Sequence, residues 1–220
     1  MSMTMKLVSI NAGLPRDLTW DGNKVTTSIW KEPVSGPVRV SRLNIDGDRQ
    51  SDLSVHGGAD KAVYVYPAEH YEYWRRELPG VELRPGAFGE NFTTTGLSEE
   101  FRIGDRLRIG SAEFAVTQPR LPCFKLALRF GRPDIVKRFL RSGRTGFYLS
   151  VTREGEVNAG DPIHVNPSPA DTLTVADIVR LYAKDSKNRE MLMLATRTAG
   201  LPESWRDYFR GRLGKLDRPA

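Results

Sequence analysis

The hydrophobic period of this chain changes once, at the segment 166–170, which reads Asn-Pro-Ser-Pro-Ala. Before this segment, from about Lys6 to Val165, short alternating or β-branched runs are separated by Gly, Pro, Asn and Asp. That pattern is typical of an antiparallel barrel or sandwich. The two prolines can continue neither a strand nor a helix, and beyond them apolar residues recur at helical spacing. The sequence therefore predicts a mainly β fold over residues 1–166 and a small helical domain over residues 171–216.

Several strands and two helices can be placed along the first part of the chain. We expect strands at residues 7–10, 38–43, 62–66, 106–109, 113–117 and 148–152. Gly110-Ser111 between two of them predicts a tight hairpin, because glycine tolerates the positive φ that such turns require. Helices are expected at 67–78 and at 133–141. The second begins with proline, where a missing N–H costs nothing, and should pack on the sheet as a lid.

The helical domain is expected to contain three helices. Thr174, with Asp177 three residues further on, is a capping signal for the first. The second should run from about residue 187 to 198, and Pro202 should begin the third. The segment contains apolar faces but no side chain that we would assign as a nucleophile or metal ligand, so we expect it to serve dimerisation or the docking of a partner protein. On this view the β domain folds and binds its ligand without the tail.

Composition excludes several classes of protein. No apolar run reaches the roughly 18 residues of a membrane span, and the first residues lack the apolar core of a signal peptide, so we expect a cytoplasmic protein. A single cysteine cannot form an internal disulfide, a four-thiolate iron–sulfur cluster or a cysteine-rich zinc site. The net charge of +6 comes from basic residues interleaved with acidic ones, which favours a solvated surface, with part of the excess serving an anionic small ligand, over a nucleic-acid-binding surface.

The one cysteine, Cys123, lies in the segment 118–126, which reads Gln-Pro-Arg-Leu-Pro-Cys-Phe-Lys-Leu. Its two prolines stiffen the backbone and so present the thiol at a defined place. Arg120 and Lys125 favour the thiolate, which is the form that acts as a nucleophile and as a metal ligand. The alternative is that Cys123 is a small buried hydrophobic residue.

Two glycine-marked loops and one polar strand are further candidates for a binding site. The segment 56–61, His-Gly-Gly-Ala-Asp-Lys, can expose consecutive N–H groups to a phosphate, although it lacks the glycine spacing of a P-loop. The segment 86–91 ends in Asn91, whose amide suits the edge of a heterocycle. The segment 24–28 forms a basic, hydroxyl-rich edge strand. Ordinary turn and strand chemistry is the alternative for all three.

These segments together strongly resemble the YiiM group of MOSC-domain proteins. The resemblance is carried, in order and spacing, by Lys24 with 28–34, by Gly47, Asp48, Gln50 and Asp52, and by the segments 56–63, 86–91 and 118–126. It extends from about Lys6 to Val165, and the tail looks like the three-helix segment that follows the MOSC barrel in this group.

The resemblance implies a MOSC-type β-barrel that binds molybdenum cofactor, that is, molybdopterin with molybdenum. Cys123 then takes the place of the cysteine that ligates the metal and is the catalytic residue. The residues that we expect to bind the cofactor are Lys24, Ser28, His56, Gly57, Gly58, Lys61, Asn91, Arg120 and Lys125. The implied reaction is reduction of N-hydroxylated compounds, such as 6-hydroxylaminopurine, to amines. Because the chain has no cluster cysteines and no dinucleotide fingerprint, we expect the electrons to come from an external flavoprotein reductase.

Two other functions stay open at this point. Cys123 could carry a persulfide in a sulfur-transfer module, which would need a cysteine desulfurase, and this chain has no room for one. A basic, non-enzymatic nucleic-acid-binding barrel would need exposed aromatic residues between lysines and arginines, and Tyr64 with Tyr66 is the only same-face pair that we can propose.

Overall fold

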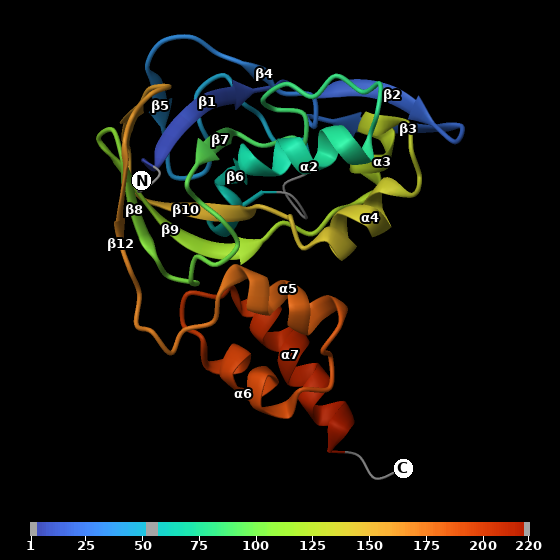
Figure 1. Cartoon of the computed structure of the whole chain (residues 1–220), viewed down its shortest axis with the longest axis vertical. Coiled ribbons are helices and arrows are strands. Elements are labelled where there is room, and N and C mark those ends of the chain that lie inside the picture. The colour runs from blue at the N-terminus through green and yellow to red at the C-terminus, as the bar shows by residue number, and fades with distance from the viewer. Residues whose placement is uncertain (1–3, 52–56, 218–220) are drawn as a thin grey trace.

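The computed structural model describes residues 4–51 and 57–217 and is dominated by one mixed sheet (Figure 1). Its strands follow the order β12-β8-β9-β10-β6-β7-β1-β4, and all neighbours are antiparallel except β6 and β7. Their bounds are β1 (Lys6–Ala12), β4 (Glu32–Pro33), β6 (Val63–Pro67), β7 (Phe92–Thr95), β8 (Arg106–Ile109), β9 (Ala112–Pro119), β10 (Phe147–Arg153) and β12 (Ile163–Asn166). Two small sheets pair β2 (Arg16–Trp20) with β3 (Asn23–Thr27), and β5 (Val38–Val40) with β11 (Gly155–Val157).

The sheet-rich fold class is confirmed, whereas the closed barrel is not. In the strand order the sheet is open, with β12 and β4 at its two edges. Main-chain hydrogen bonds nevertheless connect the start of β1 with the approach to β12: Leu7 N donates to Asp161 O at 2.9 Å, and Ile163 N donates to Met5 O at 2.9 Å. The sheet therefore curls until its first and last segments touch, and barrel closure stays a prediction.

Turns explain why the predicted hairpin at Gly110 is confirmed and why the strand predicted at 38–43 is wrong in length. Gly110 has φ +56° between the antiparallel strands β8 and β9, as the hairpin prediction requires. A Cβ at Gly110 would lie 2.3 Å from the carbonyl oxygen of Glu156. The strand predicted at 38–43 is too long, because the Ser41 N–H donates to Asn44 O and turns the chain just after β5.

Three helices cover one side of the sheet: α2 (Glu69–Glu77), α3 (Phe124–Phe130) and α4 (Ile135–Ser142). α2 and α4 confirm the predicted helices, whereas α3 was expected only as an apolar segment. Phe139 of α4 stacks on Tyr66 of β6 and on Trp74 of α2, with ring centroids 6.0 and 5.6 Å apart. Aromatic packing thus holds α2 and α4 on β6.

None of the helices in the described part of the chain is long and apolar enough to span a membrane.

The tail forms the three predicted helices, α5 (Val175–Ala183), α6 (Arg189–Arg197) and α7 (Glu203–Leu216). Thr174 and Asp177 form a reciprocal capping box, with both hydrogen bonds at 3.0 Å. Ile178 and Phe209 of the tail lie in the same buried cluster as Phe114 of β9. Because this core is shared, the packing does not favour a β domain that folds without the tail.

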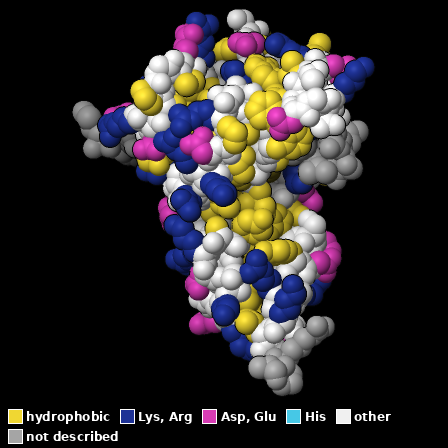
Figure 2. Space-filling model, turned by 90° about the vertical axis from the view of Figure 1, so that its right-hand side faces the viewer, with side chains coloured by type: hydrophobic (Ala, Val, Ile, Leu, Met, Phe, Trp, Pro, Cys, Tyr) yellow, Lys and Arg dark blue, Asp and Glu magenta, His cyan; other side chains and the backbone are white. Residues whose placement is uncertain are grey.

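One face of the molecule shows the mixed charge pattern of the sequence (Figure 2). On the face shown in Figure 2, Lys and Arg side chains are distributed over both the sheet part and the tail, with Asp and Glu side chains among them. Hydrophobic side chains gather where the two parts meet. On this face the mixture of charges differs from the single-sign stripe that backbone-directed nucleic-acid binding uses.

Candidate functional site

One pocket collects residues from segments that lie far apart in the sequence. It is bordered by the end of β3, the loops after β3 and β5, the short 3-10 helix η1 (Ala59–Lys61), β6, the loop before β7, the end of β9 and the start of α3. Its lining comprises Thr27, Ser28, Ile29, Lys31, Asp48, Gln50, Ser51, Lys61, Tyr64, Gly89, Asn91, Arg120, Cys123, Lys125 and Tyr148. The fold therefore places Cys123 beside several cationic and amide groups.

Most of the residues that the sequence singled out meet in this pocket. Those in its lining are Ser28, Lys61, Asn91, Arg120, Cys123 and Lys125. Lys24 is exposed on β3 and is not among the lining residues. Gly57 and Gly58 come directly before η1, where Lys61 N donates to Gly58 O at 3.0 Å. His56 lies outside the described residues. The cofactor-binding roles assigned to these residues stay predictions.

Cys123 occupies the position immediately before α3 and is partly exposed. Its backbone is extended, with φ −124° and ψ 177°, and its carbonyl accepts the first helical hydrogen bond from Leu126 N at 2.9 Å. The sequence did not predict this helix, because seven residues are too few to establish a helical period. The change from strand β9 to helix α3 fixes the place of the thiol.

Arg120 lies in the pocket wall with 6% of its surface exposed. Its guanidinium carbon lies 5.4 Å from the ring centroid of Tyr64 and 5.2 Å from that of Phe139, which is cation–π range. Burial raises the pKa of Tyr64 well above its usual value, so the hydroxyl stays protonated next to this charge. The Arg120 cation is thus held by aromatic faces.

A buried network of Lys31, Asp48 and Asn91 lies at the other side of the pocket, and the sequence assigned no role to its first two members. Asp48 accepts hydrogen bonds from Lys31 Nζ, from Gly13 N at 2.9 Å and from Asn91 Nδ2 at 2.9 Å. Asn91 Oδ1 in turn accepts from Tyr64 N at 3.1 Å. Burial lowers the pKa of Lys31, and the charge of Asp48 opposes that effect. Both residues lie inside the motif segments, which is the signal that could have identified them.

Glu90 holds the glycine-marked loop that carries Asn91. Its Oε1 accepts hydrogen bonds from Gly86 N at 2.8 Å, from Thr93 Oγ1 at 2.9 Å and from the Tyr71 hydroxyl. Glu90 is fully buried, and this burial raises its pKa despite the surrounding donors. The loop therefore has a fixed shape that places the amide of Asn91 in the pocket.

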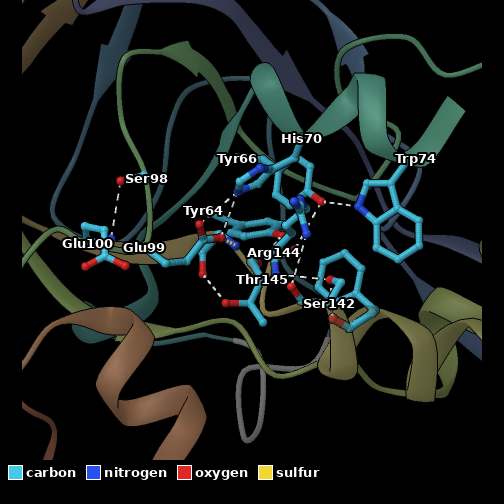
Figure 3. Close-up of polar contacts among 12 residues, drawn as sticks. Tyr64, Tyr66, His70, Trp74, Ser98, Glu99, Glu100, Ser142, Arg144 and Thr145 are labelled. Carbon is cyan, nitrogen blue, oxygen red and sulfur yellow. Dashed lines mark hydrogen bonds and ion pairs between the residues drawn. The ribbon is translucent and has the colours of Figure 1, made fainter. Parts of the chain in front are cut away.

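The segment 142–146 forms buried hydrogen bonds near Tyr64, a residue of the pocket lining, and Figure 3 shows Ser142, Arg144 and Thr145 of this segment together with Tyr64 and Glu99. The Tyr64 hydroxyl donates to a carbonyl of this segment at 2.8 Å, and Glu99 Oε1 accepts from Gly146 N at 2.7 Å. Arg120 N donates to the carbonyl of Gly146 at 3.3 Å. His70 contacts Glu99 at 2.8 Å, which links α2 to the same support. Tyr64 and Arg120, both in the pocket lining, are thus held by hydrogen bonds to the same segment.

Two buried polar atoms in the pocket wall point to a ligand. Within the described part of the chain, Ser28 Oγ and Arg120 Nη1 have no hydrogen-bonding partner. Buried polar groups are normally paired, so each of these atoms needs an explanation. Among the described residues no group of three or more His, Cys, Asp or Glu side chains could hold a metal ion. The two unpartnered donors, Ser28 Oγ and Arg120 Nη1, therefore suit a ligand with acceptor oxygens.

The aromatic pair considered for stacking on nucleic acid is buried. Tyr64 and Tyr66, the aromatic pair considered for that purpose, are 4% and 0% exposed. Stacking of bases on aromatic side chains requires accessible rings. The burial of this pair removes the feature on which the nucleic-acid interpretation depended.

Comparison with known proteins identifies two family segments. Residues 52–164 match the MOSC domain, and residues 173–215 match the YiiM-like, 3-alpha helix domain. YflK of Bacillus subtilis, an uncharacterized protein, is 41% identical over 211 residues, which are 96% of this chain and 95% of YflK. YiiM of Escherichia coli is 37% identical over 197 residues, covering 87% of each protein.

One further relative and one solved structure extend the comparison. A protein of Gibberella moniliformis called "Reductase" is 36% identical over 178 residues, which are 79% of this chain and 31% of that protein. The crystal structure of YiiM from Geobacillus stearothermophilus superposes with a TM-score of 0.80 at 36% identity and covers 95% of this chain and 99% of that one. The chain therefore belongs to the MOSC-domain family, within its YiiM group.

Proposed function

We propose that this protein is a molybdenum cofactor-dependent reductase that converts N-hydroxylated compounds, such as 6-hydroxylaminopurine, to amines. The observation that carries the proposal is the gathering of the Cys123 thiol with cationic, amide and hydroxyl groups around one pocket. A soft thiolate suits a sulfur-rich transition-metal centre, and cations with N–H and O–H donors suit the phosphate of a pterin. Membership of the MOSC family supports the same assignment.

In this proposal Cys123 is both the metal ligand and the catalytic residue. The side chains that would hold the cofactor from the pocket lining are Ser28, Lys61, Asn91, Arg120 and Lys125. Ser28 Oγ and Arg120 Nη1 have hydrogen-bonding capacity that no described protein group uses, so a ligand oxygen can take it. The other assigned residues, Lys24, His56, Gly57 and Gly58, are supported by the resemblance alone.

The reaction consumes two electrons and two protons: R–NHOH + 2 e⁻ + 2 H⁺ gives R–NH₂ + H₂O. The bound cofactor would supply the electrons. The chain supplies positioning and protons: burial lowers the pKa of both Lys31 and Lys61, so that their ammonium groups release a proton more readily than exposed lysines do. Both lysines line the pocket, where a hydroxyl leaving as water needs a proton.

The electrons must reach the pocket from another protein. The single cysteine excludes a cluster within the chain, so the proposal includes an external flavoprotein reductase as donor. The net charge of +6 favours encounter with an acidic partner. A role of the tail in dimerisation or in docking of this donor belongs to the proposal as well.

The test is the Cys123→Ser variant, purified next to the wild type from a host that makes molybdenum cofactor. We expect wild-type protein to contain molybdenum and to reduce 6-hydroxylaminopurine with an artificial reductant. The serine variant should unfold like the wild type and lose both properties, because an alcohol is a poor ligand for a soft metal at neutral pH. As a control, Met193→Leu changes a partly exposed side chain of the tail and should retain both.

Two results would contradict the proposal. A serine variant with stoichiometric molybdenum and full turnover would refute the ligand role of Cys123. Wild-type protein that contains no molybdenum but carries a sulfane sulfur on Cys123, detected by mass spectrometry, would favour the sulfur-transfer function instead.

A further inference from the structure

A buried hydrogen bond connects the three-helix tail to the strand that leads to the pocket. The indole Nε1–H of Trp205 in α7 donates to Oε1 of Gln118 at 2.8 Å. Trp205 is 8% exposed and Gln118 is 3% exposed, so water does not compete for either group. Gln118 lies near the end of β9, two residues before Arg120. The tail therefore contacts the pocket's supporting strand through a specific polar bond as well as through apolar packing.

The other end of the same Gln118 amide reaches the pocket wall. Gln118 Nε2 donates to the carbonyl oxygen of Asp60 at 3.2 Å, and the neighbouring Thr117 Oγ1 donates to that oxygen at 2.7 Å. Asp60 belongs to η1 and directly precedes Lys61, which lines the pocket. The Gln118 amide thus bridges the indole of the tail and the backbone of this wall segment.

The geometry of an amide makes these two bonds interdependent. A glutamine side chain offers one carbonyl oxygen and one NH₂ group on opposite sides. An indole N–H is only a donor, so it requires the oxygen of Gln118 on its own side. The NH₂ group must then face Asp60. Without the indole, only the 3.2 Å bond to Asp60 orients the amide, so the Gln118 side chain is fixed by one hydrogen bond in place of two.

We propose that Trp205 is a positioning residue of the pocket, which fixes the wall segment 59–61 and therefore Lys61 by orienting the amide of Gln118. The inference goes beyond the proposed function, because it concerns the pocket wall and applies to any anionic ligand that Lys61 contacts. It also assigns to the tail a contribution to the site in addition to assembly.

Trp205 also packs in the tail, so the test must separate hydrogen bonding from packing. Its ring lies 5.6 Å from that of Phe209 and 5.7 Å from that of Tyr182. Trp205→Phe removes the N–H and keeps an aromatic ring in place. Phe209→Leu is the matched control, because it loosens the same helix and forms no hydrogen bond to the sheet. Gln118→Leu removes the bridging amide while every residue of the tail stays unchanged.

The measurement is native-state hydrogen exchange of the backbone amides of residues 59–63, in the full-length protein without added cofactor. We expect Trp205→Phe and Gln118→Leu each to accelerate exchange there by about three- to tenfold, the range for loss of one buried hydrogen bond. The double variant should exchange no faster than Gln118→Leu alone, because Trp205 acts through that amide. Phe209→Leu should leave the exchange of this segment unchanged at comparable global stability.

Two outcomes overturn the proposal. The first is unchanged exchange over residues 59–63 in Trp205→Phe, and the second is an equal acceleration in Phe209→Leu, which would assign the effect to packing. If Trp205→Phe does not fold, Gln118→Leu alone decides by the same readout. Because no molybdenum enters this measurement, its result is independent of the reductase assignment. A second readout, weaker retention of molybdenum in Trp205→Phe than in Phe209→Leu, applies only if the wild type binds the metal.

Discussion

Replacing Asp48 by asparagine removes the charge that balances a buried lysine. Lys31 and Asp48 have side chains that are 8% and 1% exposed, and Asp48 also accepts hydrogen bonds from Gly13 N and Asn91 Nδ2. The amide introduced by Asp48→Asn could keep one of these contacts but would leave the Lys31 ammonium without a counter-charge. The variant therefore perturbs the network that holds both Lys31 and Asn91 in the pocket.

The expected cost follows from burial. Breaking a buried ion pair by removing one partner costs about 3–5 kcal/mol of the free energy of unfolding, because the remaining charge stays desolvated. For a chain of 220 residues this corresponds to a melting temperature lowered by about 6–20 °C. The same change at the exposed pair of Arg84 and Glu82, whose side chains are 70% and 72% exposed, should cost less than about 1 kcal/mol.

The pH dependence of the stability loss shows whether the uncompensated charge of Lys31 causes it. Burial lowers the pKa of Lys31 below 10.5, so the unfolded chain binds a proton that the folded protein releases between the two pKa values. Stability attributable to this group therefore rises with pH in that window. Loss of Asp48 lowers the folded pKa of Lys31 further, so the loss of stability in Asp48→Asn should become smaller as the pH rises towards 10.5.

Urea unfolding followed by circular dichroism at several pH values measures the stability lost in Asp48→Asn, with Glu82→Gln as the surface control. Adding Lys31→Met to Asp48→Asn removes the stranded charge and should recover at least half of the lost stability. The reasoning is refuted if Asp48→Asn costs no more than the surface control, or if its defect is independent of pH.

Two other predictions follow from the buried groups. Burial raises the pKa of Glu90 above 4.5, so the folded protein retains a proton that the unfolded chain releases, and stability should fall as the pH rises through this window. Glu90→Gln should abolish that fall in urea midpoints measured against pH, and an unchanged slope would contradict the assignment to Glu90. Truncation after Pro167 removes Ile178 and Phe209 from the shared core, so the remaining chain should lose its cooperative thermal transition and bind a hydrophobic dye. A truncated protein that melts cooperatively at the wild-type temperature would restore the sequence-based view of an independent β domain.

Local signals predicted much of the fold. The capping box at Thr174 and the turn at Gly110 depend on neighbouring residues only, and both are found where the sequence places them. α3 is the counterexample: its sequence Phe-Lys-Leu-Ala-Leu-Arg-Phe is too short to show a period, and Cys123, the residue that precedes it, forms no capping side-chain hydrogen bond to the helix. Barrel closure was beyond local signals as well, because it depends on how the first and last strands meet.

The sequence predicted those residues of the candidate site that lie close together within one motif. Cys123, Arg120 and Lys125 lie within six residues of one another, and their types alone indicate a thiol in a cationic setting. Lys31 and Asp48 are 17 positions apart, and Gln118 and Trp205 are 87 positions apart. A lysine, an aspartate or a tryptophan is usually structural or solvated when judged alone. Only the folded chain shows that these pairs are buried together.

The pocket combines groups that a protein selected for stability alone would avoid. Arg120 is buried without a carboxylate partner in the described structure, and both Arg120 Nη1 and Ser28 Oγ lack a hydrogen-bonding partner there. Such groups carry a desolvation cost of about 1–3 kcal/mol each, and more when charged. A ligand oxygen that accepts from either atom would remove that atom's cost, so the atoms whose burial lowers stability are the ones that would hold an anion. Costs of this kind are typical of functional sites, where local stability is exchanged for binding.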